Sequence, residues 1–273
     1  MMQRIGVFFN PQSAPAAGLA QALEAWLRAR GIATWCGAAS DAPQAIDRFD
    51  LLVCLGGDGT VLRAAGMAIP AQVPLLPVAL GHLSFMAEIT PDELYPSLER
   101  VLAGDYWTEE RALAEAIVQR ADHAPERFVA LNEVLIGRRD IARVLSIAVQ
   151  VDDIPMTVYH ADGVLVATAT GSTAYALAAG GPVLDPRSRA LVLVPVAAHL
   201  HNVPSLVLHE DAHLDLGVVS CHAAALAVDG RTHRPLAVND SVAVRRAPEV
   251  AHFVRVRPPS YFYQTLTRRL RRE

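Results

Sequence analysis

The sequence predicts an α/β protein, with an N-terminal doubly wound, Rossmann-like domain followed by a β-rich, β-sandwich-like domain. Up to about residue 104, apolar strand-like runs alternate with helical patterns, which is typical of a parallel sheet. After residue 105 the pattern changes to short alternating runs of antiparallel type. A final helical segment follows. We therefore expect an α/β domain over residues 1–104 and 258–273, to which the C-terminal helix returns, and a β-rich domain over residues 105–257.

The predicted elements follow from hydrophobic spacing. In the first domain we expect strands at residues 4–9, 32–35, 51–55 and 73–80, and helices at 19–30, from 61 onward and at 91–103. Thr90, Pro91 and Glu93 form a plausible capping box for the last of these. In the second we expect one helix at 173–179 and strands at 111–119, 128–136, 143–151, 156–159, 164–167, 191–196, 206–208, 214–219, 224–228 and 241–246. The arginine-rich helix at 260–272 is expected to end in solvent.

Composition excludes several classes of protein. The chain has 273 residues, enough for two domains, with 52% hydrophobic and 19% charged residues, as in a core-rich globular protein. A formal charge of −4 gives no reason to expect nucleic acid as a partner. No apolar run reaches the ~20 residues needed to span a membrane, and the first ten residues lack a signal-peptide layout. Cys36, Cys54 and Cys221 lack CxxC spacing, so we expect reduced thiols and a cytoplasmic location.

The chain contains no lysine, so all 24 basic residues are arginines. This excludes the Walker P-loop, the strand lysine of protein kinases and Schiff-base chemistry, because each of them needs an ammonium group. Any phosphate site must use arginine, backbone N–H groups or a metal.

A glycine turn with one carboxylate follows the most apolar strand. Gly56, Gly57, Asp58, Gly59 and Thr60 connect this strand to a helix. The glycines allow close approach of a ligand, and the helix N-terminus favours phosphate, so Gly56, Gly57, Gly59 and Thr60 are candidate phosphate-binding residues. Asp58 repels phosphate unless a metal, or a hydroxyl to be activated, lies between them, which suggests phosphoryl transfer. A surface turn with a helix-capping Asp is the alternative.

Two further stretches carry candidate binding groups. In residues 162–182 a strand leads into Thr170, Gly171, Ser172 and Thr173 and then a helix, which predicts a nest of donors; a capped helix is the alternative. Asn132 and Glu133 interrupt an apolar run, and burying them unpaired would cost roughly 1–3 kcal/mol each. They either bond within the protein or hold the hydroxyls of a ligand.

His209, Glu210 and His213 match the zinc motif H-E-x-x-H. The flanking runs have strand-like patterning, however, so the two histidines would not share a helical face. We therefore predict a hairpin tip here and no metal site.

These stretches, in this order, carry a family resemblance. GGDGT at 56–60, LNE at 131–133 and the segment from Asp162 to Tyr175 that ends in GSTAY resemble the NAD kinase family, which uses ATP or polyphosphate. GHLSF at 81–85 does so more loosely. GGDG alone also occurs in diacylglycerol, sphingosine and phosphofructokinase relatives, whereas GSTAY together with the preceding NE is much more specific.

The resemblance implies transfer of a γ-phosphoryl group, with Mg²⁺, to the 2′-hydroxyl of the adenosine ribose of NAD, giving NADP. It implies that Asp58 is the general base, or orients that hydroxyl, that Gly59 lies close to the dinucleotide and that Arg63 contacts a phosphate. It further implies a homodimer or homotetramer. The remaining residues of the implied NAD pocket are Asn132, Glu133, His160, Asp162, Thr173, Ala174, Tyr175, Ala176, Leu177 and Ala178.

The chain departs from the family pattern at a few positions. Ala79 and Ser84 stand where family members often have Asn and Gly, and Arg231 stands where Gln commonly follows Asp-Gly. The segment 195–204 is a reduced form of a stretch usually rich in proline and histidine. Two alternatives therefore remain: a lipid kinase that shares the glycine turn, and a non-catalytic NAD(P)-binding sensor.

Overall fold

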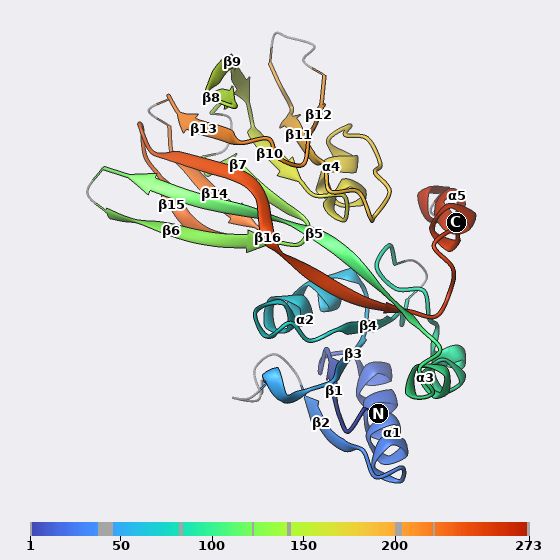
Figure 1. Cartoon of the computed structure of the whole chain (residues 1–273). Coiled ribbons are helices and arrows are strands. Elements are labelled where there is room, and N and C mark those ends of the chain that lie inside the picture. The colour runs from blue at the N-terminus through green and yellow to red at the C-terminus, as the bar shows by residue number, and fades with distance from the viewer. Residues whose placement is uncertain are drawn as a thin grey trace. The chain divides into compact units, whose positions relative to one another are not determined.

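The computed structural model describes residues 2–37, 46–81, 84–121, 123–140, 143–199, 204–220 and 222–271 (Figure 1). The chain divides into two compact units. Unit 1 comprises Met1–Glu110 and Ala251–Glu273, and unit 2 comprises Arg111–Val250. Two long strands, β5 (Trp107–Arg120) and β16 (Ser241–Arg255), contribute residues to both units. The two units therefore meet within these strands, and the division at residues 104/105 and 257/258 stays a prediction.

Unit 1 contains a parallel sheet in the order β2-β1-β3-β4, in which Phe253 of β16 pairs in parallel with Leu75 of β4. Its strands are β1 (Arg4–Phe9), β2 (Ala33–Gly37), β3 (Leu51–Leu55) and β4 (Leu75–Val78). Its helices are α1 (Ala14–Arg28), α2 (Asp58–Ala71), α3 (Leu94–Leu102) and α5 (Tyr261–Arg271), with short 3-10 turns η2 (Ile46–Arg48) and η3 (Pro91–Glu93). This confirms the α/β domain and the returning C-terminal helix.

The local chemistry explains these elements. All five residues of β3 are buried, as expected for a strand covered on both faces of a parallel sheet. The capping box of Thr90 and Glu93 is present. Helix α1 begins earlier than predicted, because a proline in the first turn lacks only an N–H that would be unpaired anyway. Helix α2 also begins earlier, at Asp58, since Gly57 is its N-cap and a carboxylate is favourable in the first turn.

Unit 2 is built from antiparallel strands. One sheet has the order β12-β11-β10-β7-β14-β15, and a second group pairs β16, β13, β8 and β9, with β5 pairing β16 and β6. Buried side chains from both groups form one apolar core, which confirms the β-rich second domain. The strands not yet bounded are β6 (His123–Ala130), β7 (Glu133–Arg138), β8 (Leu145–Val151), β9 (Ile154–Ala161), β10 (Gly163–Ala167), β11 (Leu191–Val196), β12 (Leu206–Leu208), β13 (Leu214–Val218), β14 (Ala224–Val228) and β15 (Arg231–Leu236).

Three predictions for unit 2 were wrong in detail. The strand predicted at 128–136 is two strands, β6 and β7, separated by a bend at Leu131 and Asn132. The strand at 231–236 was not predicted, because its sequence is polar and contains a proline. The predicted helix at 173–179 is a 3-10 turn, η4 (Gly171–Thr173), followed by the four-residue helix α4 (Tyr175–Ala178). No helix among the described residues has the length and apolar character needed to cross a membrane.

Candidate active site

The glycine turn lies in unit 1 between β3 and α2. A side chain at Gly56 would overlap the side chain of Thr60, which is buried, so this glycine is required by packing. A Cβ at Gly57 or Gly59 would meet nothing within 4 Å, so these two residues leave the backbone beside Asp58 open. In the first turn of α2 the N–H of Thr60 donates to the Gly57 carbonyl (2.8 Å), whereas the N–H groups of Asp58 and Gly59 precede the first helical acceptor. The arrangement suits an anionic group.

The Asp58 carboxylate is fixed by the loop that follows β4. Its Oδ1 accepts hydrogen bonds from the Ser84 hydroxyl and from the N–H of Met86 (3.3 Å), and its Oδ2 accepts one from the N–H of Phe85 (3.1 Å). Asp58 is half-buried. The carboxylate is thus held in one orientation beside the open glycines. Ser84 was not among the site residues predicted from sequence, where it was noted only as a departure from the family pattern.

Arginines from the end of the chain hold the same loop. Arg255 Nη1 donates to the carbonyl of Met86 (2.8 Å), and Arg269 Nη2 donates to the carbonyl of Ala87 (3.1 Å). Arg269 is only 8% exposed, and burial lowers its pKa below the usual range of an arginine. The prediction that this helix end is solvated is therefore wrong for Arg269. The candidate phosphate ligand Arg63 is exposed, and its Nε donates to the carbonyl of Gly59 (3.3 Å).

Asn132 and Glu133 lie in unit 2, at the bend between β6 and β7. The Asp229 carboxylate accepts the N–H groups of Leu131 (3.0 Å), Asn132 (2.7 Å) and Glu133 (3.3 Å). These bonds replace strand pairing and produce the bend. Asn132 Oδ1 and Glu133 Oε2 are both buried and have no hydrogen-bond partner within the described part of the chain. Leaving such atoms unpaired costs roughly 1–3 kcal/mol each, which favours a ligand as their partner.

Burial, and to a lesser extent the nearby Asp229 carboxylate, raise the pKa of Glu133 from 4.5 to about 7. Between these two pH values the folded chain keeps a proton that the unfolded chain releases. The stability associated with Glu133 is therefore greatest below about pH 4.5, falls as the pH rises to about 7, and stays low above it.

We expect Glu133→Gln to raise the free energy of unfolding at pH 8 by on the order of 2 kcal/mol, because glutamine has no charge to bury. The gain should shrink as the pH is lowered toward 5, where the wild-type residue is protonated. Thermal unfolding of both proteins across this range measures the difference. A difference in the free energy of unfolding between the two proteins that does not change with pH would contradict the raised pKa of Glu133.

The GSTAY segment packs on this bend. Thr168 donates its hydroxyl to the carbonyl of Leu131 (2.6 Å) and its N–H to the carbonyl of Asn132 (2.9 Å). A Cβ at Gly171 would overlap that same Asn132 carbonyl, so only glycine fits. This contact joins two of the predicted motifs within unit 2.

The predicted nest of donors is partly occupied by the protein itself. The Ser172 hydroxyl donates to the carbonyl of Ala169 (2.6 Å), and the Thr173 hydroxyl donates to that of Thr170 (3.1 Å). Both hydroxyls donate to carbonyls three residues earlier, so neither of them caps η4 or α4 as the capped-helix alternative would require. Tyr175 is 43% exposed, so its ring remains available for stacking. The other predicted residues, Ala174, Ala176, Leu177 and Ala178, are in or beside the short helix α4.

His160 and Asp162 lie away from Glu133. Glu133 pairs with Ala167 at one end of β10, whereas Gly163, the neighbour of Asp162, pairs with Gly137 at the other. Four residues of strand separate the two ends by roughly 13 Å. Asp162 forms an ion pair with Arg138 (2.9 Å), and exposed His160 has its Nδ1 3.0 Å from the Ser146 hydroxyl. One copy of unit 2 does not bring these two residues to the bend.

The H-E-x-x-H segment is a turn between β12 and β13, but the predicted hairpin tip was wrong, because β12 pairs with β11 whereas β13 pairs with β8 and β16. His209 lies 3.5 Å from the Asp211 carboxylate, and the Asp211 N–H donates to its ring. Within the described ranges no three His, Cys, Asp or Glu side chains are grouped so that they would hold a metal ion. The zinc alternative has no support here.

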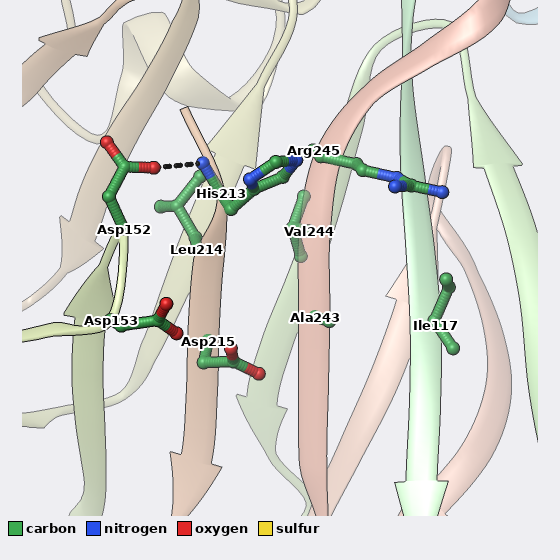
Figure 2. A pocket seen from close by; sticks show the side chains of 9 residues that line it. All are labelled: Ile117, Asp152, Asp153, His213, Leu214, Asp215, Ala243, Val244 and Arg245. Atoms are coloured by element: carbon green, nitrogen blue, oxygen red, sulfur yellow. Dashed lines mark hydrogen bonds between the residues drawn. The ribbon is translucent and has the colours of Figure 1, made fainter. Parts of the chain in front are cut away.

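Unit 2 also contains a cavity of about 430 Å³ on the sheet that includes β13 and β16 (Figure 2). At its edge the Asp152 carboxylate accepts the His213 N–H (2.9 Å). Its lining residues are Ile117, Asp152, Asp153, His213, Leu214, Asp215, Ala243, Val244 and Arg245. None of the residues predicted for the site lines this cavity. The candidate active site is therefore defined by the motif residues, and this cavity is not part of it.

Comparison with known proteins agrees with this arrangement of motifs. Residues 37–106 match the family model of the ATP-NAD kinase N-terminal domain, and residues 131–256 match that of the ATP-NAD kinase C-terminal domain. The first region contains the glycine turn, and the second contains Asn132, Glu133 and GSTAY. Each model thus covers one of the two groups of site residues.

The chain is 54% identical over 275 aligned residues to the NAD kinase of Chloroflexus aggregans, with both chains fully covered. It is 40% identical to that of Dehalococcoides mccartyi, covering 99% of this chain and 97% of the relative. Its fold resembles that of yeast NADH kinase complexed with NADH (TM-score 0.83, 22% identity, 98% and 87% covered). It also resembles that of an Archaeoglobus fulgidus NAD kinase in complex with ATP (TM-score 0.79, 21% identity, 98% of each chain covered). Because both domain models match in order and named relatives align along the full length, the chain belongs to the NAD kinase family.

Proposed function

We propose that this chain transfers the γ-phosphoryl group of ATP or polyphosphate to the 2′-hydroxyl of the adenosine ribose of NAD, making NADP. The proposal rests on two features, one in each unit. One is the Asp58 carboxylate, held by three donors beside an open glycine turn. The other is the pair of buried, unpartnered oxygens of Asn132 and Glu133, which match the donors of a ribose.

On this proposal Asp58 orients the 2′-hydroxyl and accepts its proton. A free carboxylate is a weak base, so most of the acceleration comes from alignment of the reacting groups. The backbone N–H groups of residues 57–59 bind the donor phosphates at the positive end of α2, since those of Gly56 and Thr60 already donate to the carbonyls of Val78 and Gly57. Arg63, exposed one turn into the helix, contacts a phosphate with two N–H groups.

In unit 2, Asn132 Oδ1 and Glu133 Oε2 accept hydrogen bonds from ribose hydroxyls, which removes the cost of their unpaired burial. Gly171 keeps the GSTAY segment against the same bend, and the residues of 173–178 form the wall of the NAD pocket. The exposed ring of Tyr175 stacks on a base.

Mg²⁺ enters with the donor. The described residues contain no three-ligand cage, and Mg²⁺ is commonly held by one or two carboxylates together with substrate phosphates. On this proposal the donor phosphates would hold the ion, and the free acceptor site of Asp58 would be left for the ribose hydroxyl. When bound, the ion neutralises the charge of the phosphoryl group being transferred.

A panel of donors and acceptors tests the proposal. Purified protein with Mg²⁺ is incubated with ATP or polyphosphate and with NAD or NADH, and the products are separated by chromatography. NADP or NADPH formation is expected. Tight NAD binding without product would establish the sensor alternative. Phosphorylation of diacylglycerol or sphingosine, but not of NAD, would establish the lipid-kinase alternative.

We also propose a cytoplasmic homodimer or homotetramer. Ile154, Met156 and Val158 of the edge strand β9 are 63%, 52% and 45% exposed, a row of apolar side chains of the kind that association covers. His160 is in β9 and Asp162 follows it directly. If β9 forms the contact between copies, these two residues would reach the NAD pocket of the other copy. Light scattering on the purified protein tests association, and a monomeric mass would refute it.

Free Cys36 and Cys54 fit the proposed location in a reducing compartment. Fluorescence microscopy of a tagged chain tests this location, and secretion would refute it.

A further inference from the structure

We infer that Ser84 is a positioning residue for phosphoryl transfer, because its hydroxyl holds the Asp58 carboxylate with one acceptor site left free for the ribose hydroxyl. This inference rests on the proposed function. It concerns a residue that the sequence analysis noted only as a departure from the family pattern.

The direction of the Ser84 hydroxyl is determined by its neighbours. Its oxygen accepts the N–H of Met86 (3.1 Å) and the N–H of Ala87 (2.7 Å). A hydroxyl has two acceptor sites and one donor hydrogen. With both acceptor sites used, the hydrogen points to the remaining acceptor in contact, which is Asp58 Oδ1. Ser84 is 5% exposed, so water does not compete freely for this bond.

The two oxygens of Asp58 are consequently unequal. Among the described residues, Oδ1 takes a hydrogen bond from the Ser84 hydroxyl and one from the Met86 N–H, which it shares with the Ser84 oxygen. Each carboxylate oxygen offers about two acceptor sites. Within the same residues Oδ2 takes one hydrogen bond, from the Phe85 N–H. The free acceptor site is therefore on Oδ2, and we assign the substrate hydroxyl to it. Without the Ser84 hydroxyl, Oδ1 would gain a free site and the carboxylate would have a second way to bind substrate.

The loop that carries Ser84 is itself fixed. Arg255 and Arg269 hold the carbonyls of Met86 and Ala87, the same two residues whose N–H groups bond the Ser84 oxygen. Both guanidinium groups are buried. Because these two arginines hold the loop independently of Ser84, we expect removal of the Ser84 hydroxyl to alter the contact with Asp58 more than the backbone path of the loop.

We expect Ser84→Ala to lower kcat for NADP formation about tenfold with little change in KM for NAD, because misalignment acts on the transfer step. Ser84→Thr, which restores a hydroxyl, should recover most of the loss. The matched control is Ser97→Ala, the same change at a buried position in α3, and it should keep wild-type kcat. If Ser84→Ala folds poorly, Ser84→Gly carries the same expectation.

A double mutant separates positioning from a general structural effect. In an Asp58→Asn background, Ser84→Ala should cause no further loss of kcat, because the carboxylate it positions is already absent. Wild-type kcat in both Ser84→Ala and Ser84→Gly, or an additive loss in the double mutant, would overturn the inference while leaving the proposed function intact. A wild-type protein that makes no NADP would overturn both.

Discussion

Replacing Asp58 by asparagine lowers kcat for NADP formation by more than about 10²-fold, which is the expected loss for a positioned proton acceptor. The amide oxygen of asparagine can still face the Ser84 hydroxyl and the Met86 N–H. Its amide nitrogen then occupies the place of Oδ2, where it cannot accept the ribose hydroxyl. Single-turnover assays with ATP and NAD measure the loss.

The fold should survive this change, since the side chain keeps its size and two of its three contacts. Asp50→Asn is a matched control in the same unit, because the Asp50 carboxylate also accepts two backbone N–H groups, those of Gln3 (2.6 Å) and Arg4 (2.9 Å). The control should be active at the wild-type rate. If Asp58→Asn turned over NAD at a near-normal rate, Asp58 would not be the proton acceptor.

Gly171→Ala reduces the free energy of unfolding by about 3 kcal/mol and weakens NAD binding at least tenfold. The added methyl would overlap the Asn132 carbonyl, which cannot simply move away because it already accepts the Thr168 N–H (2.9 Å). Any adjustment displaces the bend that carries Asn132 and Glu133. Denaturant unfolding measures the first effect, and calorimetric titration with NAD measures the second.

Gly217→Ala is the control for this experiment. Gly217 is also a glycine of unit 2, in β13, and a Cβ there would have its nearest contact at 4.0 Å, with Ala148. It should leave NAD affinity unchanged. Equal stability and affinity in the Gly171 and Gly217 variants would show that the contact between GSTAY and the bend is not needed.

Local patterns predicted the elements that depend on local chemistry. The apolar run of β3 and the capping box of Thr90 and Glu93 are both readable within a few residues, and both are present. Strand β15 was missed because its polar sequence lacks the alternation of a half-buried strand. The bend at residues 131–132 was missed because it depends on Asp229, about a hundred residues further along the chain.

The same limit applied to the site. The sequence predicted Asp58, Asn132 and Glu133 from their place beside glycines or within apolar runs. It did not indicate which groups fix the Asp58 carboxylate, since Ser84 lies 26 residues away and bonds it without any sequence pattern. Backbone N–H groups are present at every residue except proline, so their use at Phe85 and Met86 leaves no mark in the sequence.

The guanidinium groups that support the loop around Asp58 are contributed from far along the chain, and Arg269 lies 182 residues after Ala87, whose carbonyl it holds. A polypeptide is made from its N-terminus, so the glycine turn is made well before these arginines. A nascent chain that already contains the turn therefore lacks the support of this loop until Arg255 and Arg269 have been added.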